Sequence, residues 1–158
     1  MNQRMFLLPA LVVLAVTLAL GTPGFTGQDQ ITDKGVKKRV ALMFTAQGAV
    51  TTLTDMMAGR VAFQAGMARA AQRTLIRSSS KTVRHFRKPH FDPLSNARPE
   101  VWTHWTDFKA RADASEQAAK QLNVYSLNGL RRTLPSMLQT CLSCHDRYRA
   151  KPNEFVTH

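Results

Sequence analysis

The stretch "CLSCHDRYRAK", residues 141–151, contains both cysteines of this 158-residue chain, three positions apart, with His145 directly after the second. Four kinds of site use such a pair: a redox-active dithiol, half of a zinc site, a small disulfide or a haem attachment site. Over residues 127–150, apolar residues recur at steps of three and four, the period of an α-helix. This spacing predicts that Cys141, Cys144 and His145 share the apolar face of a last helix.

The rest of the chain discriminates between these four kinds of site. A thioredoxin-like dithiol needs a strand–helix–strand context, and the sequence shows no strand alternation. A structural zinc site takes four ligands, and the chain has no second cysteine pair. A disulfide within one helical turn would close too short a loop to restrain the unfolded chain, and it leaves His145 unexplained. C-x-x-C-H is the attachment signature of c-type haem, so we predict one covalent haem c on Cys141 and Cys144, with His145 binding the iron. A plain disulfide is the remaining alternative.

The same helical period predicts three further helices upstream of the last one. They cover residues 33–58, 61–80 and about 99–122, and Asp33 is a candidate N-cap for the first. Residues 81–98 interrupt the pattern with two prolines. Four amphipathic helices of roughly 20 residues each predict an all-α fold, a four-helix bundle, with another all-helical arrangement as the alternative.

Two details of these helices follow from the pattern. The residues of the second helix that are expected to face the core are Phe63, Met67, Ala70, Ala71 and Leu75. Pro135 lies inside the last helix, where it is expected to kink the helix or to mark its true start.

Residues 1–24 are expected to be a signal peptide and residues 25–158 to form the bundle. Arg4 precedes an apolar run over residues 5–20, and small residues follow that run. The run is shorter than the about 20 residues that usually span a membrane, so cleavage is favoured and an uncleaved anchor is the alternative. We therefore expect a periplasmic protein with no stable membrane span after removal of the leader.

The net charge of +12 restricts the partners of this chain rather than its fold. No nucleic-acid-binding motif accompanies the charge, so we expect no nucleic acid partner. For an exported protein, an anionic membrane surface or an acidic protein suits the charge better. The basic cluster of Arg84, Arg87 and Lys88 is a candidate docking patch.

With these residues identified, the sequence resembles the class II c-type cytochromes, which are cytochrome c′ and its low-spin relatives. The resemblance covers about residues 33–151 and is carried by "CLSCHDRYR" at the end, "RPEVW" at 98–102 and "RVALM" at 39–43. It implies an antiparallel four-helix bundle that carries covalent haem near its C-terminus, and it leaves a homodimer through the first two helices open.

The resemblance also implies roles for individual residues. Cys141 and Cys144 match the thioether positions, and His145 matches the proximal iron ligand. Met43, one turn after Arg39, matches the sixth iron ligand of the low-spin members. The arginines that would lie near the haem are Arg39, Arg98 and Arg149.

Two functions are consistent with these residues. With His145 and Met43 as axial ligands, the iron favours an electron carrier between redox partner proteins, whose docking surfaces we expect to be acidic. If Met43 is instead a core residue, five-coordinate iron would bind nitric oxide or carbon monoxide. No acid–base or nucleophile constellation is apparent, so we expect no enzymatic activity.

The other histidines and the tryptophans are expected to have ordinary structural roles. His85 and His90 would be solvated residues of a basic loop, and His104 and His158 would lie on the surface. Trp102 and Trp105 are expected to be packing residues.

Overall fold

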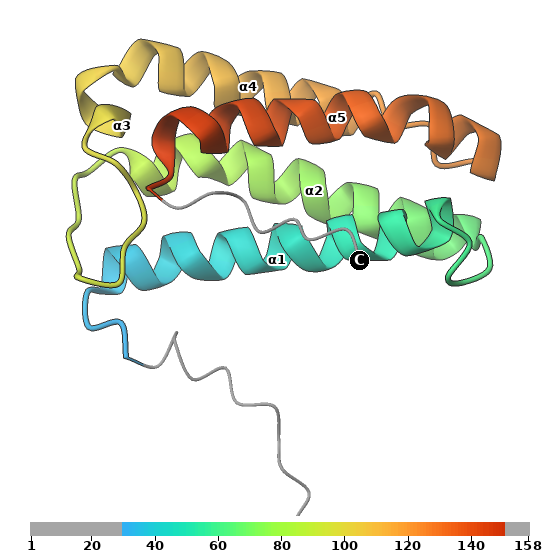
Figure 1. Cartoon of the computed structure of the whole chain (residues 1–158), viewed down its shortest axis with the longest axis horizontal. Coiled ribbons are helices and arrows are strands. Elements are labelled where there is room, and N and C mark those ends of the chain that lie inside the picture. The colour runs from blue at the N-terminus through green and yellow to red at the C-terminus, as the bar shows by residue number, and fades with distance from the viewer. Residues whose placement is uncertain (1–29, 151–158) are drawn as a thin grey trace, which may run out of the picture.

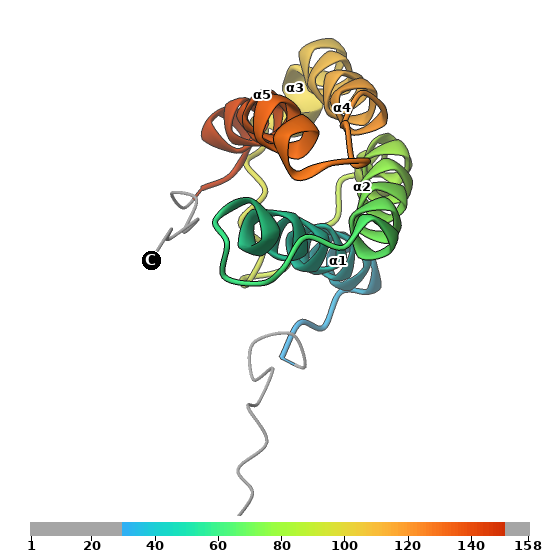
Figure 2. The same ribbon diagram turned by 90° about the vertical axis from the view of Figure 1, so that its right-hand side faces the viewer.

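The computed structural model describes residues 30–150, which form an all-α four-helix bundle (Figure 1). Its helices are α1 (Lys34–Met57), α2 (Ala65–Phe86), α3 (Glu100–Thr103), α4 (Trp105–Lys120) and α5 (Leu127–Tyr148). The long helices succeed one another around the bundle: α2 lies between α1 and α4, and α5 packs on α4 (Figure 2). The predicted fold class is therefore confirmed, and no helix within residues 30–150 combines the length and apolarity that a membrane span needs.

Local sequence signals set the ends of the first and last helices. Asp33 caps α1 by accepting a hydrogen bond from the Val36 N–H at 2.8 Å, as the sequence predicts. Ser126 caps α5 in the same way, with the Gly129 N–H at 3.0 Å. The chain leaves α1 through Gly59, whose φ of 74° suits a residue without a Cβ atom.

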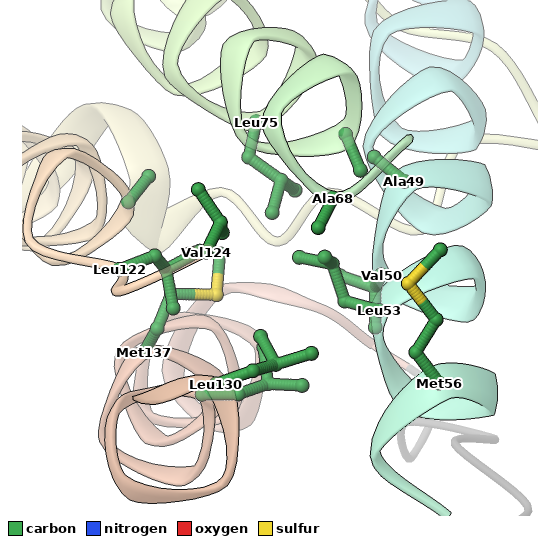
Figure 3. Close-up of a cluster of buried hydrophobic side chains, with 13 residues drawn as sticks. Ala49, Val50, Leu53, Met56, Ala68, Leu75, Leu122, Val124, Leu130 and Met137 are labelled. Carbon is green, nitrogen blue, oxygen red and sulfur yellow. The ribbon is translucent and has the colours of Figure 1, made fainter. Parts of the chain in front are cut away.

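A closely packed apolar core fills one half of the bundle (Figure 3). It joins the C-terminal half of α1 and the N-terminal half of α2 to the N-terminal half of α5 and the connection that follows α4. The side chains drawn and labelled there are Ala49, Val50, Leu53, Met56, Ala68, Leu75, Leu122, Val124, Leu130 and Met137. Burying one large apolar side chain contributes about 1.5–3 kcal/mol, so the side chains of this half hold the helices together.

The second helix differs from its prediction in extent and in orientation. It begins at Ala65 and continues to Phe86, six residues beyond the predicted end. Met67 and Ala70 are exposed, and the buried face is made of Ala68, Ala71, Leu75, Ser78, Thr82 and Phe86. The polar Ser78 and Thr82 concealed this face in the sequence, because an apolar stripe that contains hydroxyl groups no longer stands out.

Two further predictions about helix ends are corrected. The segment expected over 99–122 is interrupted at His104, whose φ and ψ of −114° and 44° separate α3 from α4, and α4 ends at Lys120. Pro135 does not begin the last helix, since α5 starts eight residues earlier. Pro135 lies on the exposed side of α5, where its ring meets solvent rather than a neighbouring helix.

Candidate functional site

A cavity of about 870 Å³ occupies the half of the bundle that the core leaves free. Among neighbouring long helices, α1 and α5 have the least contact with each other, and both contribute walls to this cavity. The apolar side chains that line it include Val36, Val40, Val50, Leu75, Phe86, Val101, Phe108 and Ala112. Its volume is in the range of about 300–1,000 Å³ that is usual for small-molecule and cofactor sites.

The three residues of the C-x-x-C-H motif line this cavity from α5. Cys141 and Cys144 are free thiols, and the Nδ1 atom of His145 is buried. Burial raises the pKa of the Cys141 thiol, and it raises the pKa of Cys144 to about 11. Both sulfurs belong to one helix and line the same cavity, as attachment to a single flat group requires.

Met43 reaches the same cavity from α1. Its half-buried side chain packs together with Cys144 against a cluster of large side chains at this end of the bundle. The cluster consists of Phe86, Val101, Phe108 and Tyr148. The fold thus brings Met43 and His145, about one hundred positions apart in the chain, to the walls of one cavity.

The arrangement fits a covalently held haem better than a bare metal ion. Within residues 30–150, no three His, Cys, Asp or Glu side chains are grouped as metal ligands. A porphyrin supplies four ligands of its iron, so the protein needs to add only one or two axial ligands. The apolar walls, the two cysteines on one helix and the half-buried His145, whose Nδ1 atom is buried, meet that need.

Arg39 lines the cavity but is also a structural residue. It is only 2% exposed, and its guanidinium donates to the carbonyl oxygens of His85 (3.0 Å), Lys88 and His90 (3.1 Å). Burial lowers its pKa. The Arg39 side chain therefore joins the second turn of α1 to the segment that follows α2.

Two aromatic rings lie next to the guanidinium of Arg39. Its Cζ atom lies 4.8 Å from the ring centroid of Phe86 and 5.0 Å from that of Trp102. Trp102 also donates its indole N–H to the Phe86 carbonyl at 2.8 Å, and Trp105 stacks on Phe108 with centroids 5.5 Å apart. Both tryptophans are therefore packing residues, as predicted.

The two other arginines lie near the point where α5 ends. Arg149 does not continue the His145 face of α5, because the helix ends at Tyr148 and Arg149 is extended, with φ of −110° and ψ of 132°. A bridge to Ala97 holds it, and it still lines the cavity. Arg98 is not among the residues that line the cavity; its N–H donates to the Tyr148 carbonyl at 2.9 Å.

Sequence reasoning missed the contribution of the loop between α2 and α3. Leu94, Ser95, Asn96 and Ala97 form part of the cavity wall. The only signal for this role was the length of the interruption, because long connections in compact domains often serve a site. The loop path itself depends on contacts with α1 and α5, which no local pattern encodes.

The sequence also did not reveal a polar contact that closes the cavity end of the bundle. The Tyr148 hydroxyl donates to Asp107 at 2.5 Å, and Arg111 donates to the same carboxylate at 2.8 Å. These bonds, that of Arg111 first, lower the pKa of Asp107, whereas burial and the nearby carboxylate raise the pKa of Tyr148. They connect α4 to the last turn of α5.

Among residues 30–150, His85, His90 and His104 are not part of the cavity wall, and two of them differ from their prediction. His85 belongs to the last turn of α2 rather than to a loop. His90 is half-buried and pairs with Asp33 at 3.2 Å, against Gly35, which leaves room for the imidazole. His104 is exposed, as expected, and His158 lies outside the described residues.

Comparison with known proteins gives a consistent result. The family model described as Cytochrome C' matches residues 34–149. Cytochrome c-556 of Agrobacterium tumefaciens (strain apple 185) is 28% identical over 117 residues, which cover 72% of this chain and 92% of that protein.

Solved structures of similar fold are of the same kind. A structural model of oxidized cytochrome c556 from R. palustris has a TM-score of 0.69 at 17% identity, covering 77% of this chain and 100% of that one. A nitric oxide complex of a cytochrome c prime variant from Alcaligenes xylosoxidans has a TM-score of 0.66 at 25% identity, covering 74% and 94%.

Proposed function

The chain belongs to the cytochrome c′ family, because the family model covers residues 34–149, and from this premise we propose that it carries single electrons in the periplasm. Proteins of this family are non-enzymatic haem proteins, usually periplasmic, and their cofactor is covalent haem c. The two C-terminal cysteines of this chain provide the corresponding attachment positions.

The proposal assigns roles to four residues that line the cavity. Cys141 and Cys144 form the thioether bonds, His145 is the proximal ligand and Met43 is the sixth ligand. Haem, when bound, supplies an iron that gains and loses one electron. The imidazole of His145 and the thioether of Met43 would fill both axial positions, which raises the reduction potential and leaves no open position for a substrate.

The observation that carries the proposal is that Met43 and His145 reach one cavity from different helices. Both side chains belong to long helices, and Met43 also packs against the Phe86–Tyr148 cluster. A ligand held by packing in this way needs little rearrangement when the charge of the iron changes. Thioether sulfur is a soft ligand that suits haem iron, and the largely apolar walls suit the apolar side chain that carries it.

Arg39 is proposed to lie near a haem propionate and Arg149 near the proximal side of the haem, since both residues line the cavity. Arg39 has five N–H donors, of which three N–H groups serve the 85–90 segment. Arg98, which does not line the cavity, would act only at its edge. The proposal for these arginines concerns binding of the cofactor rather than electron transfer.

A second function has one observation in its favour. Met43 packs against a cluster of large apolar and aromatic side chains, as a core methionine would. If it does not bind the iron, the protein would be a five-coordinate haem protein that binds nitric oxide or carbon monoxide. One similar solved structure is a nitric oxide complex of a cytochrome c prime variant.

The Met43→Ala variant distinguishes the two functions. We expect the wild-type holoprotein to be low-spin and the variant to be high-spin in ferric and ferrous optical spectra, because alanine cannot replace the thioether. Met67→Ala is the matched control, since Met67 is exposed on α2 and does not line the cavity. A wild-type spectrum that is already high-spin, or one unchanged in Met43→Ala, would remove Met43 from the iron and favour gas binding.

The redox partners are proposed to be proteins with an acidic docking surface. The net charge of +12 supports this proposal, because opposite charges accelerate encounter. Arg84, Arg87 and Lys88 are exposed at the end of α2, next to the loop that forms part of the cavity wall. This position makes them the candidate docking patch for electron transfer.

A further inference from the structure

The outward side of α2 carries a row of four basic side chains that the proposed function does not use. The row, which we call the α2 ridge, consists of Arg69, Arg73, Arg77 and Lys81. Successive members are four residues apart, so neighbours lie one helical turn from each other, and all four are exposed. No Asp or Glu occurs between Arg60 and Asp92.

The α2 ridge lowers the stability of its own helix. Like charges at a spacing of four residues destabilise a helix by about 0.2–0.5 kcal/mol per pair. Within the described part of the chain, none of the four side chains forms a salt bridge that would offset this repulsion. A row of this kind therefore suits an anionic surface that lies outside the fold.

The ridge faces away from the cavity. The buried side of α2 contains Ala68, Ala71 and Leu75, and at 100° per residue the four ridge positions fall on the opposite side of the helix. In Figure 2, α2 lies at the outer edge of the bundle, flanked by α1 and α4. Whatever binds the ridge thus leaves the cavity side of the molecule accessible.

We propose that the α2 ridge binds the anionic phospholipid surface of a membrane. Basic side chains near such a surface are attracted without any requirement for a complementary shape. Trp, Tyr and Arg are the residues that most often dominate specific protein interfaces. From Gln64 to His85 the chain has no Phe, Tyr or Trp, so of these residue types only Arg is present. The ridge therefore has the charge that a membrane surface attracts and lacks the aromatic anchors of a protein-docking site.

A second copy of this chain is a poor occupant of the ridge. A two-fold contact through this side of α2 would bring the same four positive charges against each other. Binding of the ridge to a membrane goes beyond the proposed electron transfer. Because Arg84 falls on the same side of α2 as the ridge, binding to a membrane would compete with docking of a redox partner at Arg84, Arg87 and Lys88.

A small pocket beside the ridge offers a place for one phosphate headgroup. Its volume is about 220 Å³. The residues that line it are Leu42, Thr45, Thr74, Arg77, Ser78 and Lys81. Two cationic residues of the ridge, Arg77 and Lys81, thus line one hollow between α1 and α2, which suits an anionic phosphodiester.

Vesicle flotation of the holoprotein tests the proposal. We expect the protein to float with vesicles that contain phosphatidylglycerol, to stay behind with vesicles of phosphatidylcholine alone, and to be released by salt at roughly 0.5 M. An apolar anchor would not distinguish the two lipids, so the comparison is specific for charge. Equal binding to both lipids would overturn the proposal.

Two variants with the same net charge locate the surface. In the ridge variant, Arg69, Arg73, Arg77 and Lys81 are changed to Gln. The control variant changes four exposed basic residues of α4 and α5 instead: Lys109, Lys120, Arg132 and Arg147. We expect the ridge variant to bind phosphatidylglycerol vesicles at least about a hundredfold more weakly than the wild type, because each ridge cation contributes directly at the membrane surface. The affinity of the control variant for the same vesicles should fall much less.

The remaining outcomes are also decisive. Equal weakening in both variants would show that net charge alone drives binding and would overturn the role of the ridge. If the ridge variant no longer binds immobilised poly-L-glutamate but still binds phosphatidylglycerol vesicles as the wild type does, the ridge would be assigned to an acidic polypeptide instead. Changing Arg69 with Arg73, and Arg77 with Lys81, in separate variants keeps the test valid if the fourfold variant folds poorly, which circular dichroism detects.

Discussion

Arg39 is the residue that joins α1 to the loop before α3. Its buried guanidinium donates to three backbone carbonyls and lies within about 5 Å of the ring centroids of Phe86 and Trp102. We expect Arg39→Ala to lower the free energy of unfolding by about 3–5 kcal/mol, because three partly buried carbonyls lose a charged donor and a void remains. Urea unfolding of the holoprotein measures this change.

The neighbouring Lys38 provides the control for Arg39. Lys38 is exposed on the same turn of α1, so Lys38→Ala should change the free energy of unfolding by less than about 0.5 kcal/mol. If Arg39→Ala is as mild as Lys38→Ala, the loop is held by other contacts.

Asp92 fastens the same loop to the start of α1. Its carboxylate accepts hydrogen bonds from the Leu94 N–H (3.0 Å), from the N–H and hydroxyl of Thr32 (2.8 and 3.0 Å), and from the Asp33 N–H (3.1 Å). These bonds, that of Leu94 first, lower the pKa of Asp92 from 3.8 to about 2. The ionised form is thus the one that the folded state prefers.

Stability should therefore depend on pH through Asp92. A carboxylate whose pKa is lower in the folded state stabilises the protein above its unfolded pKa, and the contribution is lost as the pH falls towards 2. Thermal melts of wild type and Asp92→Asn should differ fully at pH 5 to 7 and should converge as the pH falls from about 4 to 2. Asp113→Asn, at an exposed position of α4, is the control. A difference between wild type and Asp92→Asn that does not change with pH would rule out the charge of the carboxylate as its source.

Among the elements, α5 contains an internal destabilising residue. Pro135 removes one N–H from the helix ladder yet lies on an exposed side of α5, so the helix continues through it. We expect Pro135→Ala to raise the free energy of unfolding by about 1–3 kcal/mol, because alanine restores a donor and has the highest helix propensity. Ser136→Ala, at the next exposed position, should change it by only a few tenths of a kcal/mol. If Pro135→Ala leaves the free energy of unfolding unchanged or lowers it, the proline would instead stabilise the path that α5 takes along the cavity.

The two halves of the bundle differ in what stabilises them. One half has the apolar core of Figure 3, whereas the other has a cavity of about 870 Å³ with aromatic packing at its end. The walls of this cavity are largely apolar, so a group that fills it would bury apolar surface that is otherwise open to water. We therefore expect such a group to contribute to the stability of this half of the bundle.

Removal of the cofactor should consequently disrupt the whole molecule. We expect the Cys141→Ala, Cys144→Ala double variant to retain helix but to lose its cooperative thermal transition and to bind a hydrophobic dye, as a collapsed state does. Circular dichroism and dye fluorescence measure both effects, and Ser143→Ala, at the exposed position between the cysteines, is the control. A colourless double variant with a sharp transition at the wild-type temperature would show that the bundle is stable without haem.

Local chemistry in the sequence was sufficient for part of this structure. The spacing of Cys141, Cys144 and His145 depends only on the pitch of one helix, and the Asp33 cap depends only on residues three positions apart. For the same reason, the number of long helices and the fold class could be predicted from the apolar period.

The tertiary structure decided what those local rules do not encode. A helical period shows which side of a helix is apolar but not which helix that side meets, so the arrival of Met43 and His145 at one cavity required the assembled bundle. Ser78 and Thr82 concealed the inward side of α2 because their hydroxyls face the interior, where Thr82 donates to the Ser78 carbonyl at 3.1 Å. The binding of the loop by Arg39 joins positions nearly fifty residues apart, and contacts at that separation form only when the packed helices bring their ends together.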